Sequence, residues 1–337
     1  MARQVNFGLW YDFRNPAGEL SYEDFYTTTL DQIAWAEELG FESVWLTEHH
    51  FVQDGYTPSP LVIGAAIAQK TKSMQIATNL MLLPLADPVR LAEDAATLSI
   101  LSSGRFDLGV GLGYRQIEFD YFGRELKYRP SLMEEGIDII RQAWTGEPIR
   151  IDGRRYQIDG LAVAPVPATK PRLLMGGMAE PAIARAARLG DGFLSTGGIG
   201  HAEYIAALES LGKPRTDGAI FAGHWGVISD DPEQEAARMG EYALYQTNEY
   251  IKWGAFGPPD ETPVFPDAAA ALDGGLYEML DGEGAVQALT SLLTEYPEIK
   301  DVHFWAQFPG EPFEQGNARI EYMAKNVLPK VRQQLGE

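Results

Sequence analysis

The residues best suited to chemistry are two adjacent histidines between an acidic and an aromatic residue, Glu48-His49-His50-Phe51. An imidazole changes its charge near neutral pH and can act as a general acid or base, and a neighbouring carboxylate can orient it or tune its pKa. The pair follows a short apolar strand, so alternate side chains point in opposite directions and only one histidine would face a site there. A structural core histidine is the common alternative. The pair therefore predicts one acid–base histidine, with Glu48 as its partner.

Two glycine-rich turns later in the chain are of a kind that binds phosphate. Gly176-Gly177-Met178 passes from an expected strand into a helix, and Ser195-Thr196-Gly197-Gly198 follows the next strand. Glycine lets the backbone approach a ligand closely, and a helix N-terminus presents unpaired N–H groups to an anion. The alternative is a tight turn that needs glycine only for a positive φ. Two neighbouring turns favour a phosphate site, because barrels often bind phosphate late in the chain.

Aromatic residues follow several of the expected strands: Trp10, Tyr11, Tyr114, Trp225 and Trp305. Gathered at one end of a sheet, they could line a pocket for a flat aromatic ligand. For any single one of them, packing in the core is the more common role. We expect Trp10, Tyr114, Trp225 and Trp305 to form a substrate pocket.

Strands and helices alternate along the chain, which predicts a parallel sheet. Apolar runs predict strands at Val5–Trp10, Phe41–Leu46, Met74–Leu80, Gly104–Val110, Pro171–Met175, Gly192–Ser195, Ile220–Val227 and Val302–Trp305. Capping residues and helical spacing predict helices near residues 21–39, 58–70, 88–101 and 131–144. Eight units favour closure into a (β/α)8 TIM barrel. A doubly wound open sheet is the alternative, but its Gly-x-Gly-x-x-Gly turn is missing after the first strand.

Two segments interrupt the alternation. Ile149–Tyr156, with Asp152-Gly153 as a two-residue turn, predicts a β-hairpin, and Pro165–Pro171 predicts a rigid loop behind it. Trp253–Asp281 is rich in glycine, proline and acidic residues, and is longer than an ordinary connection, so it predicts a functional lid or a disordered loop. We therefore expect residues 1–337 to form a single barrel domain with insertions near 149–171 and 252–281.

Composition narrows the class of protein. The 337 residues contain 27 Lys and Arg against 48 Asp and Glu, a formal net charge of −21, which disfavours nucleic acid and membrane surfaces as partners. There is no cysteine, which excludes disulfides, thiolate metal sites and cysteine nucleophiles, and the five histidines include no His-x-x-x-His pair, so we expect no metal site. No signal peptide or membrane span is expected, and the predicted location is the cytoplasm.

Four ordered motifs resemble those of the bacterial luciferase-like flavin monooxygenase superfamily. They are GFESVWLTEHHF at residues 40–51, ATNLMLLP at 77–84, DPVRLAED at 87–94 and SGRFDLGVG at 103–111. The resemblance runs from Phe7 to about Phe193. It implies a luciferase-like (β/α)8 barrel that binds a reduced flavin at the strand ends.

The resemblance also implies roles for single residues. It makes His49 the histidine needed for chemistry and places a non-proline cis peptide, Asn79–Leu80, beneath the flavin ring. The remaining residues that it implies for the cofactor are Gly111 and Arg115 after the fourth strand, and Gly176, Gly177, Met178 and Ser195 around the phosphate. Luciferase has an arginine where this chain has Leu112, and Glu-Ser where it has Gly177-Met178, so Arg115 is the expected substitute and a general member of the superfamily is favoured over luciferase.

The expected function is that of a two-component monooxygenase acting on a small organic substrate. It would use O2 and reduced FMN supplied by a separate flavin reductase, with His49 managing a proton. A deazaflavin-dependent dehydrogenase or reductase is the alternative, although relatives of that kind usually carry Asp-His instead of Glu-His-His. A catalytically silent flavin-binding subunit is a third possibility, against which Glu48-His49-His50 argues. Family dimers pack through the early helices, so we expect a homodimer.

Overall fold

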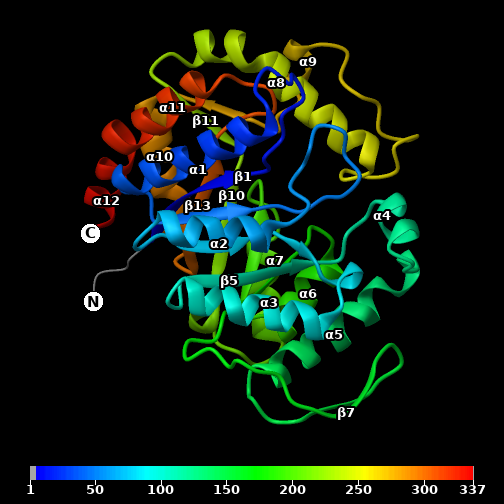
Figure 1. The fold of residues 1–337 in the computed structure, drawn as a ribbon. Helices are drawn as coiled ribbons and strands as arrows, with labels where there is room; N and C mark the ends of the chain where they lie inside the picture. Colours follow the sequence, from blue (N-terminus) through cyan, green and yellow to red (C-terminus); the bar gives the residue numbers. More distant parts are fainter. Residues whose placement is uncertain (1–4, 337) are drawn as a thin grey trace.

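The computed structural model describes residues 5–336, and its centre is a closed barrel of parallel strands (Figure 1). The strands, in chain order, are β1 (Asn6–Tyr11), β2 (Ser43–Leu46), β3 (Gln75–Thr78), β5 (Phe106–Gly111), β8 (Leu173–Gly176), β9 (Gly192–Thr196), β10 (Ile220–His224) and β13 (Ile299–Trp305). Each pairs in parallel with its neighbours, and pairing of β3 with β5 and of β1 with β13 closes the ring. The predicted (β/α)8 barrel is confirmed.

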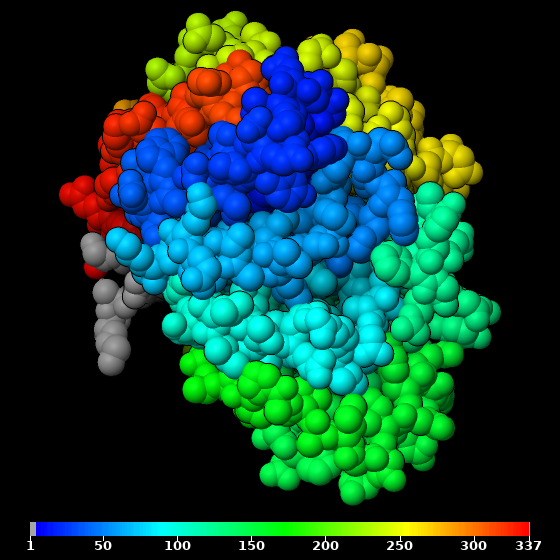
Figure 2. All heavy atoms as spheres, viewed as in Figure 1, coloured from blue at the N-terminus to red at the C-terminus, as the bar shows by residue number. Residues whose placement is uncertain are grey.

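Helices surround the barrel, and in the space-filling view their side chains cover this face of it (Figure 2). They are α1 (Tyr22–Glu38), α2 (Pro60–Lys70), α3 (Pro88–Leu101), α4 (Gln116–Tyr121), α5 (Arg129–Ala143), α6 (Glu180–Leu189), α7 (His201–Ser210), α8 (Pro232–Trp253), α9 (Ala268–Asp273), α10 (Gly282–Glu295), α11 (Phe313–Tyr322) and α12 (Leu328–Leu335). Short turns of 3-10 helix lie at Leu83–Leu85, Leu126–Tyr128 and Arg215–Asp217, and a π-helical turn lies at Met323–Val327. The first helix begins at an N-cap, since the Ser21 side chain accepts a hydrogen bond from the Asp24 N–H.

Two expected strands are divided in the structure. The run Met74–Leu80 ends as a strand at Thr78, the Asn79–Leu80 peptide is cis, and β4 (Met81–Leu82) continues the pairing with β5. The run Ile220–Val227 breaks at Trp225 into β10 and β11 (Gly226–Ile228), and β11 leaves the barrel to pair with β12 (Glu278–Leu280). Both breaks occur at the end of the strands where the aromatic residues gather.

Both insertions differ in detail from the expectation. The predicted hairpin exists as β6 (Ile149–Asp152) and β7 (Gln157–Leu161), at the lower edge of Figure 1. Its turn lies later than predicted: Asp152 pairs with Gln157 and the Gly153 N–H donates to the Tyr156 carbonyl, so the chain reverses at Arg154-Arg155 and not at Asp152-Gly153. The segment Trp253–Asp281 is not a disordered loop, since it contains α9 and β12. It packs against α8 at the opposite edge of Figure 1.

None of the helices between residues 5 and 336 is long and apolar enough to span a membrane.

Candidate active site

A cavity of about 390 Å³ opens at the carboxyl ends of the barrel strands, where TIM barrels place their active sites. Its volume lies in the range of small-molecule and cofactor sites. Most of its lining is apolar, and includes Trp10, Leu80, Leu82, Leu112, Leu194, Trp225 and Trp305. A small number of polar groups, among them Thr47, Glu48, His49, Asn79, Tyr114 and Arg129, interrupt that lining.

The structure brings the four predicted pocket aromatics together. Trp10 and Trp305 stack with ring centroids 4.3 Å apart and an interplanar angle of 7°, and Trp225 meets Trp305 edge-on at 5.8 Å. Tyr114 reaches the same cavity from the loop after β5. These contacts form a rigid aromatic wall, because stacked and edge-to-face pairs are favourable arrangements of ring quadrupoles. That these four aromatic residues bind the substrate remains a prediction.

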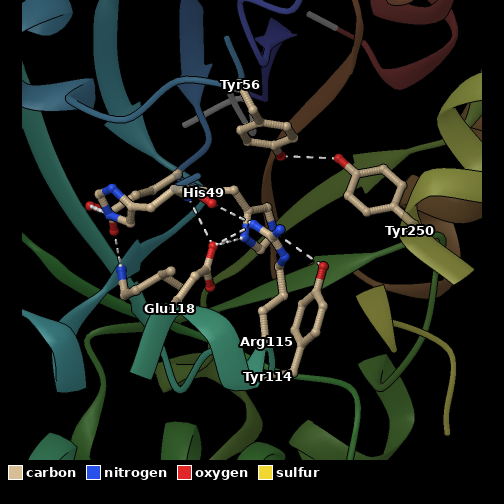
Figure 3. Close-up of polar contacts among 9 residues, drawn as sticks. His49, Tyr56, Tyr114, Arg115, Glu118 and Tyr250 are labelled. Carbon is tan, nitrogen blue, oxygen red and sulfur yellow. Dashed lines mark hydrogen bonds and ion pairs between the residues drawn. The ribbon is translucent and has the colours of Figure 1, made fainter. Parts of the chain in front are cut away.

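His49 lies at the wall of this cavity with both ring nitrogens engaged (Figure 3). Its Nδ1 lies 2.9 Å from Glu118 Oε1, and its Nε2 lies 3.1 Å from the Tyr114 hydroxyl. Because an ionised carboxylate can only accept, Nδ1 carries the proton and donates to Glu118. The Nε2 lone pair then accepts from the Tyr114 hydroxyl. The rings of Tyr56 and Trp253 meet the imidazole edge-on at 4.9 and 5.3 Å.

The surroundings of His49, Glu118 and Tyr114 determine which of these groups is charged at neutral pH. Burial is the largest influence on His49 and lowers its pKa, against the opposing hydrogen bond and charge of Glu118. Burial acts to raise the pKa of Glu118, but hydrogen bonds from His49 and the His50 N–H, together with the Arg115 charge, bring it below the usual value. At neutral pH the site therefore holds a neutral imidazole beside an ionised carboxylate. Tyr114 remains a neutral phenol, because burial raises its pKa well above the usual value.

Glu48 does not make the contact that the sequence predicts for it. Its Oε1 lies 3.2 Å from His50 Nε2, and its Oε2 accepts a hydrogen bond from the Leu82 N–H. The hydrogen-bond partner of His49 is instead Glu118, from the short helix α4. Glu118 is 69 positions away in the chain, so local spacing could not indicate it. An acidic residue in the first turn of the helix that follows the Tyr114-Arg115 loop is the only sequence signal for it.

The expected phosphate turn borders the cavity. Gly176, Gly177 and Met178 line it together with Ala179 and Ala182 at the start of α6. A Cβ on Gly177 would lie 2.5 Å from the Ala182 Cβ, so the close approach of this turn to α6 requires glycine. The backbone N–H groups at the start of α6 have no side-chain cap. This is the geometry that favours an anion.

The cation at the cavity wall is Arg129 and not Arg115. Arg115 is buried and donates to the His50 carbonyl at 2.6 Å and to Glu118 at 2.9 Å, with its guanidinium over the Trp253 ring. These contacts hold it behind His49 and outside the cavity lining, so the structure gives no support to the expected phosphate contact, which stays a prediction. Arg129, at the start of α5, lines the cavity with the α6 turn. Within residues 5–336 its guanidinium makes no ion pair or hydrogen bond.

Two further expected cofactor residues do not line the cavity. Ser195 points outward from β9, where its hydroxyl pairs with His201 Nε2 at 2.7 Å, whereas its neighbours Leu194 and Thr196 face the cavity. Alternation of side chains along a strand explains the difference. Gly111 lies beneath Leu80, where a Cβ would come within 2.5 Å of the leucine side chain. Because Gly111 has no side chain, it leaves room for Leu80 and does not itself form part of the cavity wall.

The residues present fit a flavin. The cavity combines flat aromatic walls for a ring system with a glycine turn, an uncapped helix start and an unpaired arginine for a phosphate. The predicted cis bond is present at Asn79–Leu80, and both residues line the cavity. Among residues 5–336 no three metal-ligating side chains come together.

Comparisons with known proteins agree with this geometry. The family model described as luciferase-like monooxygenase matches residues 5–288. An uncharacterized protein, y4vJ, of Sinorhizobium fredii is 32% identical over 330 residues, 91% of this chain and 92% of its own length. An F420-dependent hydroxymycolic acid dehydrogenase of Mycobacterium tuberculosis is 29% identical over 334 residues, 93% of this chain and 87% of its own length.

Two solved structures share the fold over nearly their whole length. The monooxygenase RslO1 from Streptomyces bottropensis has a TM-score of 0.83 at 21% identity, and the alignment covers 96% of this chain and 99% of that one. The oxygenating constituent of 3,6-diketocamphane monooxygenase from Pseudomonas putida, in complex with FMN, has a TM-score of 0.78 at 19% identity, with coverages of 97% and 98%.

Proposed function

The chain belongs to the luciferase-like monooxygenase family, whose members are flavin-dependent or F420-dependent oxidoreductases, and on that premise we propose that it is an FMN-dependent monooxygenase. It takes reduced FMN from a separate flavin reductase and uses O2 to oxidise a small organic substrate. The supporting observation is the pairing of a mostly apolar cavity with a neutral, doubly hydrogen-bonded His49. Oxygen chemistry on a flavin needs a site that keeps water away, and a mostly apolar lining disfavours water.

Each group at the cavity has a part in this proposal. When bound, FMN supplies the electrons and the ring at which O2 reacts. Arg129 and the start of α6 hold the phosphate, and the aromatic wall holds the ring and the substrate. His49 Nε2 takes up or returns a proton, with the Tyr114 hydroxyl as its hydrogen-bond partner. Glu118 keeps the other proton of the imidazole on Nδ1.

The direct test is to mix the protein with reduced FMN and then with aerated buffer in a stopped-flow spectrometer. The protein should slow reoxidation of FMN relative to free flavin, because the cavity shields the ring from water. His49→Ala should retain the fold by circular dichroism and lose turnover by about 10²–10⁴-fold, the usual contribution of a general acid or base. Reoxidation at the rate of free FMN would overturn the proposal.

A deazaflavin-dependent dehydrogenase is the second candidate, because the Mycobacterium tuberculosis relative that aligns with 93% of this chain is F420-dependent. Fluorescence titrations with FMN and with the deazaflavin coenzyme F420 separate the two candidates. Our proposal requires tighter binding of FMN. Tighter binding of the deazaflavin, with no effect on FMN reoxidation, would favour the dehydrogenase.

Two partner proposals accompany the function. The flavin reductase is a transient partner, and a second copy of the chain is expected through the early helices. Exposed apolar side chains on those helices, Val62 at 72%, Ile100 at 46% and Leu101 at 47% exposure, are compatible with such a dimer. Light scattering of the purified protein measures its mass directly, and a monomer would contradict the expectation.

A further inference from the structure

A chain of buried polar groups runs from the barrel interior to the cavity. Asp301 Oδ1 lies 3.0 Å from His303 Nδ1, and His303 Nε2 lies 3.0 Å from Asn79 Nδ2. The Ser43 hydroxyl donates to the second oxygen of Asp301. The His303 side chain is fully buried, Asp301 is 2% exposed and Asn79 is 6% exposed. Of these four residues, only Asn79 lines the cavity.

The donors and acceptors in this chain can be ordered in only one way while Asp301 is ionised. A carboxylate only accepts, so His303 must carry its proton on Nδ1. Burial is the largest influence on His303 and lowers its pKa, so the ring stays neutral and Nε2 keeps a lone pair. That lone pair must receive a hydrogen bond, and the only donor on the Asn79 side chain is its amide nitrogen. The Asn79 oxygen must therefore face away from His303.

Neighbouring rings prevent the imidazole from turning over. His303 stacks on Trp45 with centroids 4.4 Å apart at 18°, and it meets Trp10 edge-on at 5.3 Å and 82°. The Trp45 indole N–H is in turn held by Ser43 at 3.0 Å. Within residues 5–336 no group hydrogen-bonds to the Asn79 oxygen. It is thus an oriented acceptor at the cavity wall without a partner from the protein.

We propose that Asp301 and His303 are positioning residues that hold the Asn79 amide with its oxygen toward the cavity, where it accepts a hydrogen bond from an N–H group of the bound cofactor ring. The ligand half of this proposal rests on the proposed function. Reduced flavin carries more ring N–H groups than oxidised flavin. An oriented acceptor therefore suits the form of the cofactor that a two-component enzyme must capture.

The first experiment needs no cofactor. Nitrogen-15 NMR of histidine-labelled wild-type protein should show His303 neutral with its proton on Nδ1, and Asp301→Asn should move that proton to Nε2, as loss of the carboxylate does in other Asp–His pairs. Ser43→Ala is the matched control, because it removes a hydrogen bond of Asp301 without removing its charge, and it should leave the tautomer unchanged. A proton on Nε2 in the wild type, or an unchanged tautomer in Asp301→Asn, would overturn the proposal.

The second experiment measures binding of reduced FMN without oxygen, by quenching of tryptophan fluorescence. Asn79→Leu should weaken binding about 10-fold, because it leaves a ligand donor without an acceptor. Asp301→Asn should weaken binding to a similar extent, and the double variant should lose no more than either single one, because both changes remove the same hydrogen bond. Thermal unfolding by circular dichroism and unchanged His201 signals confirm that each variant folds.

The outcomes separate the two proposals. Fully additive losses, or unchanged binding in Asn79→Leu, would overturn the role of Asn79 as an acceptor. If wild-type protein does not bind reduced FMN at all, the proposed function and the ligand half of the inference fail together. The NMR experiment still decides whether Asp301 and His303 orient the amide.

Discussion

Glu118 determines which ring nitrogen of His49 carries the proton, although it lies outside the motif that contains the histidine. It accepts a hydrogen bond from the Nδ1–H, and its charge acts to raise the His49 pKa. Glu118→Gln keeps the shape but removes the charge, so the His49 pKa should fall further. We expect turnover to fall by about 10²-fold and the acidic limb of the pH–rate profile to move to lower pH.

Glu48→Gln is the comparison variant for this prediction. Glu48 bonds to His50 and to the Leu82 N–H, so its replacement should cost less turnover than that of Glu118. Turnover measured as a function of pH for both variants shows which of the two substitutions lowers turnover more. A larger loss of turnover for Glu48→Gln would show that Glu48, as the sequence predicts, is the carboxylate that acts on His49.

Arg129 is the second residue for which a single substitution gives a clear result. It is the arginine at the cavity wall without a partner among residues 5–336. Arg129→Met should raise the Kd for FMN about 10-fold or more, since hydrogen bonds to charged groups are the strong ones. The Kd for riboflavin, which lacks the phosphate, should not change.

The matched control for Arg129 is Lys127→Met, from the adjacent turn. Lys127 pairs with Glu125 and lies outside the cavity lining, so both affinities should remain as in the wild type. Isothermal titration with FMN and riboflavin measures all four values. Equal weakening of FMN and riboflavin by Arg129→Met would show that the arginine acts on the ring site and not on the phosphate.

Among the helices, α8 is held over the site by a buried arginine. Arg14 Nε lies 2.6 Å from Asp54, which also accepts a hydrogen bond from Tyr245 on α8 at 2.9 Å. The guanidinium lies 5.1 Å from the ring centroids of both Tyr245 and Trp253. Trp253 in turn contacts His49, so Arg14 connects the segment after β1 to the ring that packs against the histidine.

Removal of one partner of the Arg14–Asp54 ion pair should therefore destabilise the packing of α8 over the site. Arg14→Leu leaves the Asp54 charge buried without its cation, and we expect the free energy of unfolding to fall by about 3–5 kcal/mol. In the double variant Arg14→Leu with Asp54→Asn, the free energy of unfolding should fall by less than the sum of the two single changes, because the Asp54 charge is removed together with its cation. Urea unfolding followed by tryptophan fluorescence measures each value, and additive losses would contradict the prediction.

At the scale of the whole molecule, buried titratable groups make stability depend on pH. Burial lowers the pKa of His201 from 6.5 to about 4. The unfolded chain therefore binds more protons between pH 4 and 6.5, and stability falls as the pH drops through that window. Burial raises the pKa of Asp12 from 3.8 to about 6, and its contribution has the opposite sign between pH 3.8 and 6.

The variant His201→Gln separates the contribution of His201 to the pH dependence of stability from that of Asp12. Wild-type protein should lose stability relative to this variant between pH 7 and pH 4.5, by about 1.4 kcal/mol for each unit of pH below 6.5. Asp12 is unchanged in the variant, so its contribution cancels in the difference. Urea unfolding at the two pH values provides the measurement, and equal pH dependence of the two proteins would contradict the assignment.

The sequence alone determined the barrel and the region of its candidate active site. Apolar runs and helix caps carry that information, because a strand or helix depends mainly on residues near it in the chain. The same local information placed His49 and four aromatic residues at the strand ends, and the structure brings them to one cavity. It also predicted the α6 turn, whose glycines border that cavity.

Only the tertiary structure decided which groups act on one another. Glu118 reaches His49 across 69 positions, and His303 reaches Asn79 across 224. Arg115 and Ser195 have the residue types of a phosphate site, yet packing turns one behind His49 and the other toward His201. The direction of a side chain at a strand end and the docking of the next helix depend on contacts with distant elements. Local sequence therefore locates the candidate active site, and long-range packing selects the partners within it.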